Sequence, residues 1–210
     1  MNKIFICRLI AGLSFVVLLS SCSSVVTTTK NEESTGYINA DNPDIQYIGR
    51  FDFSNPSKVT YDWAGVFIHA NFEGTSCCVR MGGHKNEYAV VVDNHAPRIL
   101  TVDSSGVYKI ASGLADSLPH SVTITKRSES LFGKGEFDGF ILDKGKNLLP
   151  PEHRPERRIE FIGNSITCGY GVEGENGNCT FSLETENASM SYAGMTARAL
   201  NADYSLVAYS

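Results

Sequence analysis

The sequence has no excess of positive charge. Its 210 residues include 18 Lys and Arg against 23 Asp and Glu, which gives a formal net charge of −5. Nucleic-acid binding requires clustered basic residues that neutralise phosphates, and binding to anionic lipid requires a polybasic patch. The sequence has neither, so we expect no nucleic-acid partner and no electrostatic attachment to a membrane.

The sequence also lacks the cysteine and histidine spacings of metal sites. None of the six cysteines stands in a Cys-x-x-Cys pair or in the Cys/His spacing of a zinc site, so we expect no metal. The apolar run from Leu9 to Leu19 is shorter than the roughly 20 residues that cross a bilayer as a helix. The chain as a whole is 42% hydrophobic and 20% charged, ordinary values for a globular protein with a core.

The first 22 residues have the pattern of a secretory signal peptide. Lys3 and Arg8 precede the apolar run, and a charged segment, a short apolar segment and small residues before a cleavage site define such signals. Cys22 follows Leu19-Ser20-Ser21 and resembles the lipidated cysteine of the bacterial lipobox. An ordinary signal peptide with a coincidental cysteine is the alternative. We expect an exported lipoprotein that Cys22 anchors at the outer membrane or cell surface. Anchoring on the periplasmic face is an alternative.

A polar segment and then a series of strands follow. Residues 23–40 are rich in Ser, Thr, Asn and Glu, a composition that predicts a flexible tether. Between residues 41 and 149, apolar and polar residues alternate in short runs such as Val66–Phe72 and Val122–Thr125, and turn signals such as Gly82-Gly83 separate the runs. The pattern predicts an antiparallel β-sandwich of the jelly-roll kind over residues 41–149.

The composition changes at residues 150–157. Three prolines there cannot continue a helix or a β-ladder, so we place a linker between two domains at this point. Beyond it, the pattern predicts a strand at 158–162, a helix at 188–201 and a strand at 204–209, which form one βαβ unit of a parallel sheet. One such unit cannot bury both faces of its sheet. We therefore expect residues 158–210 to be the truncated beginning of an α/β domain.

Ser165 stands at the carboxyl end of the first strand of that unit, the sheet edge at which α/β proteins bind ligands. Gly163 allows close backbone approach there, and the N–H of Ser165 itself is placed to contribute to an oxyanion hole. The Gly-x-Ser-x-Gly motif of nucleophile elbows is half met, because Thr167 replaces the second glycine. Ser165 is therefore a candidate nucleophile, and a serine that only caps a turn is the alternative.

The segment from Arg158 to Gly171 resembles carbohydrate esterase family 2 of the SGNH or GDSL hydrolases. Ser191 to Leu200 fits the first helix of that family's catalytic domain, and His120 to Glu129 with Gly139-Phe140 fits its amino-terminal jelly roll. The resemblance implies that the sandwich precedes a flavodoxin-like SGNH-hydrolase domain with Ser165 as its catalytic nucleophile.

The same resemblance implies a reaction and a substrate. The enzyme would remove O-acetyl groups from plant cell-wall polysaccharide of the xylan or mannan type, with a preference for the sugar 6-position. The acetyl group would pass through a serine acyl-enzyme, and no cofactor is implied. The implied partner is an acetylated polysaccharide or oligosaccharide, and contact with a membrane would be through the lipid anchor only.

Two departures from the family pattern bear on activity. Asn164 stands where the superfamily usually has Asp before the serine, which keeps the shape of the side chain and drops its charge.

The family's general base is a histidine late in the catalytic domain, and its other oxyanion donors are a glycine after the second strand and an asparagine further on. All five histidines of this chain precede Ser165: His69, His84, His95, His120 and His153. We therefore expect the 210-residue chain to lack the general base and to be inactive by itself.

The cysteines and the one tryptophan leave further alternatives. Cys168 and Cys179 bracket a Gly-rich loop after the candidate nucleophile; in an exported protein a disulfide between them would close a short ring, although the spacing alone does not fix the pairing. Cys77 and Cys78 are expected as small buried residues on a strand. Trp63 either stacks on a sugar or anchors the core of the sandwich.

Two other functions remain open from the sequence. In the first, the chain is a surface glycan-binding lipoprotein in which the sandwich is the functional unit and the esterase half is non-functional. In the second, the chain belongs to an SGNH enzyme that acts on another ester, such as a lipid or a peptidoglycan acetyl group.

Overall fold

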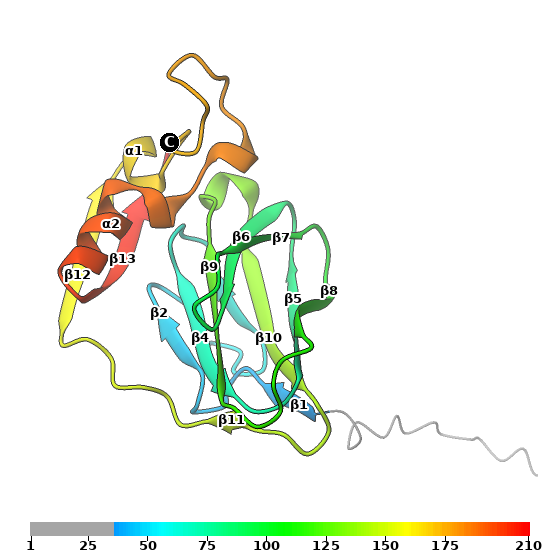
Figure 1. The fold of residues 1–210 in the computed structure, drawn as a ribbon. Helices are drawn as coiled ribbons and strands as arrows, with labels where there is room; N and C mark the ends of the chain where they lie inside the picture. The colour runs from blue at the N-terminus through cyan, green and yellow to red at the C-terminus, as the bar shows by residue number, and fades with distance from the viewer. Residues whose placement is uncertain (1–35) are drawn as a thin grey trace, which may run out of the picture. The chain divides into compact units, whose positions relative to one another are not determined.

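The computed structural model describes residues 36–210 of the chain (Figure 1). The predicted signal peptide, its lipidation site Cys22 and most of the predicted tether lie outside the described residues.

Five antiparallel strands form the first sheet. Their order is β1-β10-β5-β8, and β3 also pairs with β10. The strands are β1 (Gly36–Asn39), β3 (Val59–Tyr61), β5 (Ser76–Gly83), β8 (Gly106–Ser112) and β10 (Gly135–Leu142).

Six antiparallel strands form the second sheet. Their order is β11-β4-β9-β6-β7, and β2 also pairs with β4. The strands are β2 (Gln46–Ile48), β4 (Phe67–Phe72), β6 (Asn86–Val92), β7 (Arg98–Val102), β9 (His120–Lys126) and β11 (Leu148–Leu149).

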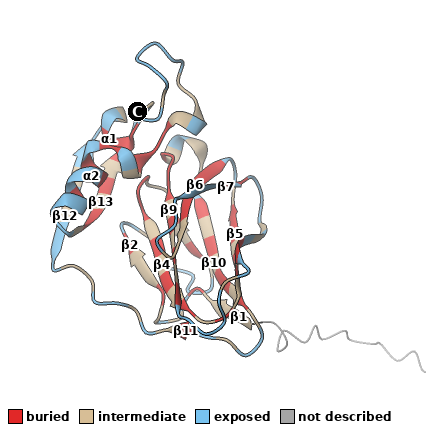
Figure 2. Cartoon of the chain, in the orientation of Figure 1, coloured by how far each residue is buried: buried red, intermediate tan, exposed pale blue. Residues whose placement is uncertain are grey.

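The two sheets enclose one hydrophobic core. In β4, Ile68, Ala70 and Phe72 are buried while the residues between them are half-buried, the period of two of a strand with one covered face. Side chains from both sheets, including Phe137 and Phe140 of β10, belong to the same cluster. Figure 2 shows the buried residues concentrated along β4, β9 and β10. The prediction of an antiparallel β-sandwich is confirmed.

Two strands lie where the alternation in the sequence predicted them: β4 over the run Val66–Phe72 and β9 over the run Val122–Thr125. β1, β2, β3 and β11 have two to four residues each, too few for a period of two to be evident. The two adjacent cysteines lie on β5, where Cys77 is buried and Cys78 is half-buried.

A parallel pair of strands follows the sandwich. Residues 150–156 contain no helix or strand, and the domain boundary placed there stays a prediction. β12 (Arg157–Gly163) and β13 (Ala202–Ala208) then pair in parallel, with Arg157 opposite Ala202 and Gly163 opposite Ala208. Four short helical segments lie between them: α1 (Ser165–Cys168), η3 (Leu183–Thr185), η4 (Ala188–Met190) and α2 (Tyr192–Ala199).

The single helix predicted at 188–201 is wrong in its bounds. The structure has the 3₁₀ turn η4 and then α2, separated by Ser191, whose ψ of 164° is that of extended backbone. The Ser191 hydroxyl donates to the carbonyl of Ala188 at 2.8 Å, and the Asn187 side chain caps η4 by accepting from the N–H of Ser189. Local side-chain bonds of this kind compete with a continuous helix.

Small residues allow α2 to lie close against the parallel pair. Ala193 and Ala197 are fully buried in a cluster with Tyr204 and Leu206 of β13, and Ala64 of the sandwich joins it. None of the helices in residues 36–210 is long and apolar enough to cross a membrane.

Candidate active site

Ser165 lies immediately beyond the carboxyl end of β12. It is the first residue of α1, follows the N-cap Asn164 and is half-buried. The first backbone N–H of a helix has no partner within the helix. The turn therefore presents a hydroxyl and an N–H of the same residue at the sheet edge.

Asn164 shows what the residue before the serine does. Its side-chain oxygen accepts a hydrogen bond from the N–H of Ile166 at 3.2 Å, and its carbonyl accepts from Thr167 at 2.9 Å. An amide oxygen fills this capping position as well as a carboxylate does. The Asn that departs from the superfamily pattern thus retains the contact that orders the turn.

Gly163 is required by the side chain that packs over it. A Cβ at this position would lie 2.1 Å from Oγ1 of Thr167, far inside any allowed contact. Thr167 is buried, and its hydroxyl lies 3.0 Å from the hydroxyl of Tyr192 on α2. The expected close approach at Gly163 is therefore made by a side chain of the turn that carries Ser165.

The loop after Ser165 closes on itself. Gly169 ends α1 in the left-handed region with φ at 79°, and its carbonyl accepts from the N–H of Asn187 at 3.1 Å. The ring of Tyr170 stacks on Phe181 with centroids 3.9 Å apart. The ring centroid of Phe132, in the sandwich, lies 5.9 Å from that of Phe181. The loop therefore packs against the sandwich.

A buried charged segment of the sandwich holds this loop. We call residues Lys126–Glu129 the anchor segment; all four are 3% exposed or less. Within it, Arg127 donates to the Glu173 carboxylate at 2.7 Å and to the carbonyl of Glu184 at 2.8 Å. The carbonyl of Arg127 accepts from the N–H of Ala188 at 3.1 Å. Backbone and side chain of one residue thus bind both ends of the loop.

The rest of the anchor segment forms a buried charge cluster. The ammonium of Lys126 donates to the carbonyls of Ser128 at 2.7 Å and Glu129 at 3.1 Å. Burial lowers the pKa of Lys126 to about 8, although nearby carboxylates oppose the shift. Burial, and then the Glu129 carboxylate, raise the pKa of Glu186 to about 8. Near neutral pH Glu186 therefore carries a proton, which relieves the repulsion between the two acids.

Glu129 reaches the carboxyl end of β13. Its carboxylate accepts from the N–H of Ser210 at 2.8 Å and from the Ser210 hydroxyl. The thiol of Cys168, at the end of α1, lies 3.9 Å from the same carboxylate. One side chain of the sandwich therefore contacts α1, which begins with Ser165, and the segment just beyond β13.

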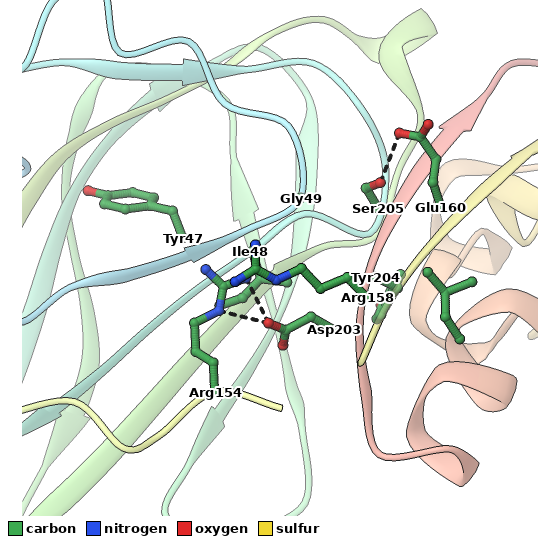
Figure 3. A pocket seen from close by; sticks show the side chains of 10 residues that line it. Tyr47, Ile48, Gly49, Arg154, Arg158, Glu160, Asp203, Tyr204 and Ser205 are labelled. Carbon is green, nitrogen blue, oxygen red and sulfur yellow. Dashed lines mark hydrogen bonds and ion pairs between the residues drawn. The ribbon is translucent and has the colours of Figure 1, made fainter. Parts of the chain in front are cut away.

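A polar cleft lies between the parallel pair and strand β2 of the sandwich (Figure 3). It has a volume of about 420 Å³ between β2 and strands β12 and β13. Arg154 is bound to Asp203 at 2.7 Å, and Glu160 accepts from Arg50 and Ser205. Both acidic groups that line the cleft are thus paired, Asp203 with Arg154 inside it and Glu160 with Arg50 of the sandwich, so Glu160 links the parallel pair to the sandwich.

Comparison with known proteins identifies the family. Residues 47–151 match the family model described as carbohydrate esterase 2 N-terminal. The chain belongs to carbohydrate esterase family 2. The cellulase/esterase CelE of Acetivibrio thermocellus is 42% identical over 172 residues, which are 81% of this chain and 21% of that protein. An acetylxylan esterase / glucomannan deacetylase of Cellvibrio japonicus is 33% identical over 160 residues, 75% of this chain and 43% of that protein.

Solved structures of the family share the fold. A family two carbohydrate esterase from Clostridium thermocellum in complex with cellohexaose has a TM-score of 0.73 and 40% identity, over 79% of this chain and 51% of that chain. The Cellvibrio japonicus family two enzyme has a TM-score of 0.77 and 28% identity, over 84% and 53%. The chain thus spans about half of these structures and less than half of the two curated relatives.

Two of the described histidines have hydrogen-bond partners away from Ser165. His69 lies 2.9 Å from the Thr123 hydroxyl, and burial lowers the pKa of its ring. His120 has Asp93 on one ring nitrogen and the carbonyl of Ala115 on the other. Within residues 36–210, no hydrogen bond joins any histidine to Ser165.

The disulfide left open from the spacing is absent from the structure, where Cys168 and Cys179 are both free. Cys168 is fully buried beside Glu129, and burial raises the pKa of its thiol to about 12. Cys179 is exposed and donates to the carbonyl of Asn176 at 2.8 Å. One thiol is therefore buried and the other exposed, and they do not form a disulfide although they are close in the sequence.

Sequence reasoning missed the anchor segment. Its residues Lys126, Arg127 and Glu129 directly follow an alternating strand, where charged residues are usually solvated. The available signal was the density of charge at the end of a buried strand, together with the resemblance of this stretch to the family's jelly roll. Neither assigns a role, because the partners in the second part of the chain lie 39 to 81 residues further along.

Proposed function

We propose that this chain supplies the sandwich and the nucleophile of a serine carbohydrate esterase that removes O-acetyl groups from plant cell-wall polysaccharide. The observation that carries the proposal is Ser165 at the start of α1, directly beyond β12. The parallel β12–β13 pair is, in this proposal, the opening of an SGNH-type domain. The family relationship supports the reaction, and the name of the Cellvibrio japonicus relative supports acetylated xylan and glucomannan as substrates.

The proposed reaction divides into two steps. The Ser165 hydroxyl attacks the acetyl carbonyl, its proton passes to a general base, and the N–H of Ser165 donates to the developing oxyanion. The bond between the acetyl carbon and the sugar oxygen then breaks, and the base returns its proton to that oxygen. Water, deprotonated by the same base, attacks the acetyl-enzyme and releases acetate and free Ser165. In this proposal the general base and further oxyanion donors come from outside the residues described, as the family resemblance implies; two described histidines, His69 and His120, are bonded elsewhere.

Acetate release tests the proposal. The protein in its natural length is assayed on acetylated xylan and glucomannan, beside Ser165→Ala and the control Ser205→Ala, a serine of β13 that binds Glu160. We expect Ser165→Ala to lower kcat by about 1,000-fold or more and Ser205→Ala to retain activity. Residues 1–210 alone are expected to release no acetate. A Ser165→Ala variant as active as the wild type would overturn the assignment.

A second candidate is glycan binding by the sandwich without catalysis. A pocket of about 260 Å³ is lined by Phe51, Trp63, Asp52 and Asp62, among others, and aromatic rings beside carboxylates suit a sugar. Trp63 also packs against the core. Binding of cellohexaose or xylan by residues 1–210, weakened by Trp63→Phe and accompanied by no acetate release from any form, would favour this candidate.

We also propose that Cys22 anchors the protein to a membrane after export. The support is the sequence alone, namely the apolar run and the residues before Cys22. Metabolic labelling with a fatty acid should mark the wild type and not Cys22→Ala. Equal labelling of both would refute the anchor.

A further inference from the structure

We propose that Glu129 of the sandwich is a positioning residue for acyl transfer at Ser165, a role that rests on the proposed function. Its carboxylate joins α1, which begins with the nucleophile, to the carboxyl end of β13. The sandwich would then set the geometry of the site as well as support it.

The contacts of the buried Glu129 carboxylate are long-range. The residue is 0% exposed. One oxygen accepts from the N–H of Ser210, 81 residues away, at 2.8 Å, and the other accepts from the Ser210 hydroxyl. The Cys168 thiol, three residues after Ser165, lies 3.9 Å away. Both elements therefore meet at a single side chain.

The backbone of Glu129 is itself fixed. Its N–H donates to the Glu186 carboxyl group at 3.1 Å, and its carbonyl accepts from the ammonium of Lys126 at 3.1 Å. Neither partner is exposed to solvent. Both backbone groups are held by buried partners, so the point from which the side chain extends cannot shift without breaking buried hydrogen bonds.

Position matters here because chemistry occurs at the carboxyl ends of parallel strands. The turn that starts α1 carries Ser165, and Ser210 lies where the chain leaves β13. A change in the distance between these two segments would displace the Ser165 hydroxyl from groups at the end of β13. It would remove no contact with the substrate. A misplacement of about 1 Å costs roughly 100-fold in rate, so the effect falls on kcat and not on KM.

The first test is hydrogen exchange in the 210-residue chain. Amide exchange is followed in peptides covering 164–170 and 204–210 for the wild type, Glu129→Ala and Glu129→Gln. The control Glu175→Gln removes the same charge from an exposed residue of the adjoining loop. We expect Glu129→Ala to accelerate exchange in both peptides and to leave β4 and β6 unchanged, with Glu129→Gln between. A purely structural role would instead accelerate exchange throughout the sandwich.

The second test is kinetic and uses the protein in its natural length. Glu129→Ala should lower kcat for acetate release about 100-fold with KM unchanged, Glu129→Gln should recover part of the loss, and Glu175→Gln should match the wild type. If the wild type is active and Glu129→Ala shows unchanged exchange and unchanged kcat, the role of Glu129 is overturned and the proposed function stands. A wild type that releases no acetate would overturn the proposed function, and this role with it.

Discussion

The guanidinium of Arg127 lies 2.7 Å from the carboxylate of Glu173 and joins the sandwich to the loop that follows Ser165. The side chain of Arg127 is 4% exposed, and Glu87 lies on its other side at 3.5 Å. An arginine so deeply buried requires its carboxylates to remain charged. The contact makes the loop after Ser165 dependent on the sandwich.

Replacing Arg127 with Met should loosen that loop. The change leaves Glu87 buried without a cation, and breaking a buried ion pair costs about 3–5 kcal/mol. We expect a loss of this size in urea-induced unfolding and faster proteolysis within residues 170–186. Arg158→Met, at an exposed position of β12, is the matched control. Equal stability of the two variants would show that the buried arginine contributes nothing.

Glu186 should make stability fall as pH rises. Its pKa is raised from 4.5 to about 8 in the folded protein, so between these values the folded state holds a proton that the unfolded state has released. The free energy of unfolding then decreases with pH in that window. Glu186→Gln cannot ionise and should show a flatter dependence in urea titrations from pH 4.5 to 8. An unchanged slope would place the buried carboxyl group in its ionised form.

His120 should stabilise the sandwich only while it is protonated. Burial favours the neutral ring, but the carbonyl of Ala115 and then Asp93 outweigh it, and the pKa of His120 rises above 6.5. The stabilisation is complete below the unfolded pKa and is lost as pH rises through the folded one.

The measurement compares unfolding free energies of His120→Gln and the wild type across that range. The difference should shrink as the pH rises above 6.5. His84→Gln, at an exposed position, should show no such trend. A constant difference for His120→Gln would contradict the account.

An alanine at Gly163 should disrupt the turn that carries Ser165. The added Cβ would lie 2.1 Å from Oγ1 of Thr167 and force this side chain away from Tyr192. Overpacking of this kind costs about 1–3 kcal/mol, which a thermal melt would detect. Gly177→Ala is the control, since no atom lies within 4 Å of a Cβ there. If both variants melt like the wild type, the close approach at Gly163 is unimportant.

The sandwich was predictable because one face of each long strand is buried. The alternation at Ile68, Ala70 and Phe72 appears in both the sequence and the burial pattern. Ser165 was predictable as a residue at a strand end, because local turn chemistry decides that position. The break in the predicted helix at Ser191 was not, since it depends on a hydroxyl that binds the carbonyl of Ala188.

The buried charges could not be predicted by such local rules. Lys126, Glu129 and Glu186 are each fully buried, although these residue types usually lie at the surface. Their burial depends on contacts between the sandwich and a loop roughly 50 residues later, which no periodicity encodes. Sequence reasoning therefore located the strand end that carries Ser165 and missed the buried charges that hold the following loop.

The most direct test of the central claim is to find the acetyl group on Ser165. The protein in its natural length is mixed with an activated acetate ester, quenched in acid within the first turnover, and digested for peptide mass spectrometry. The account predicts one acetyl group on the peptide that contains Ser165, and none in Ser165→Ala. Acetate release by the wild type with that peptide unmodified, and an equal rate from Ser165→Ala, would contradict it.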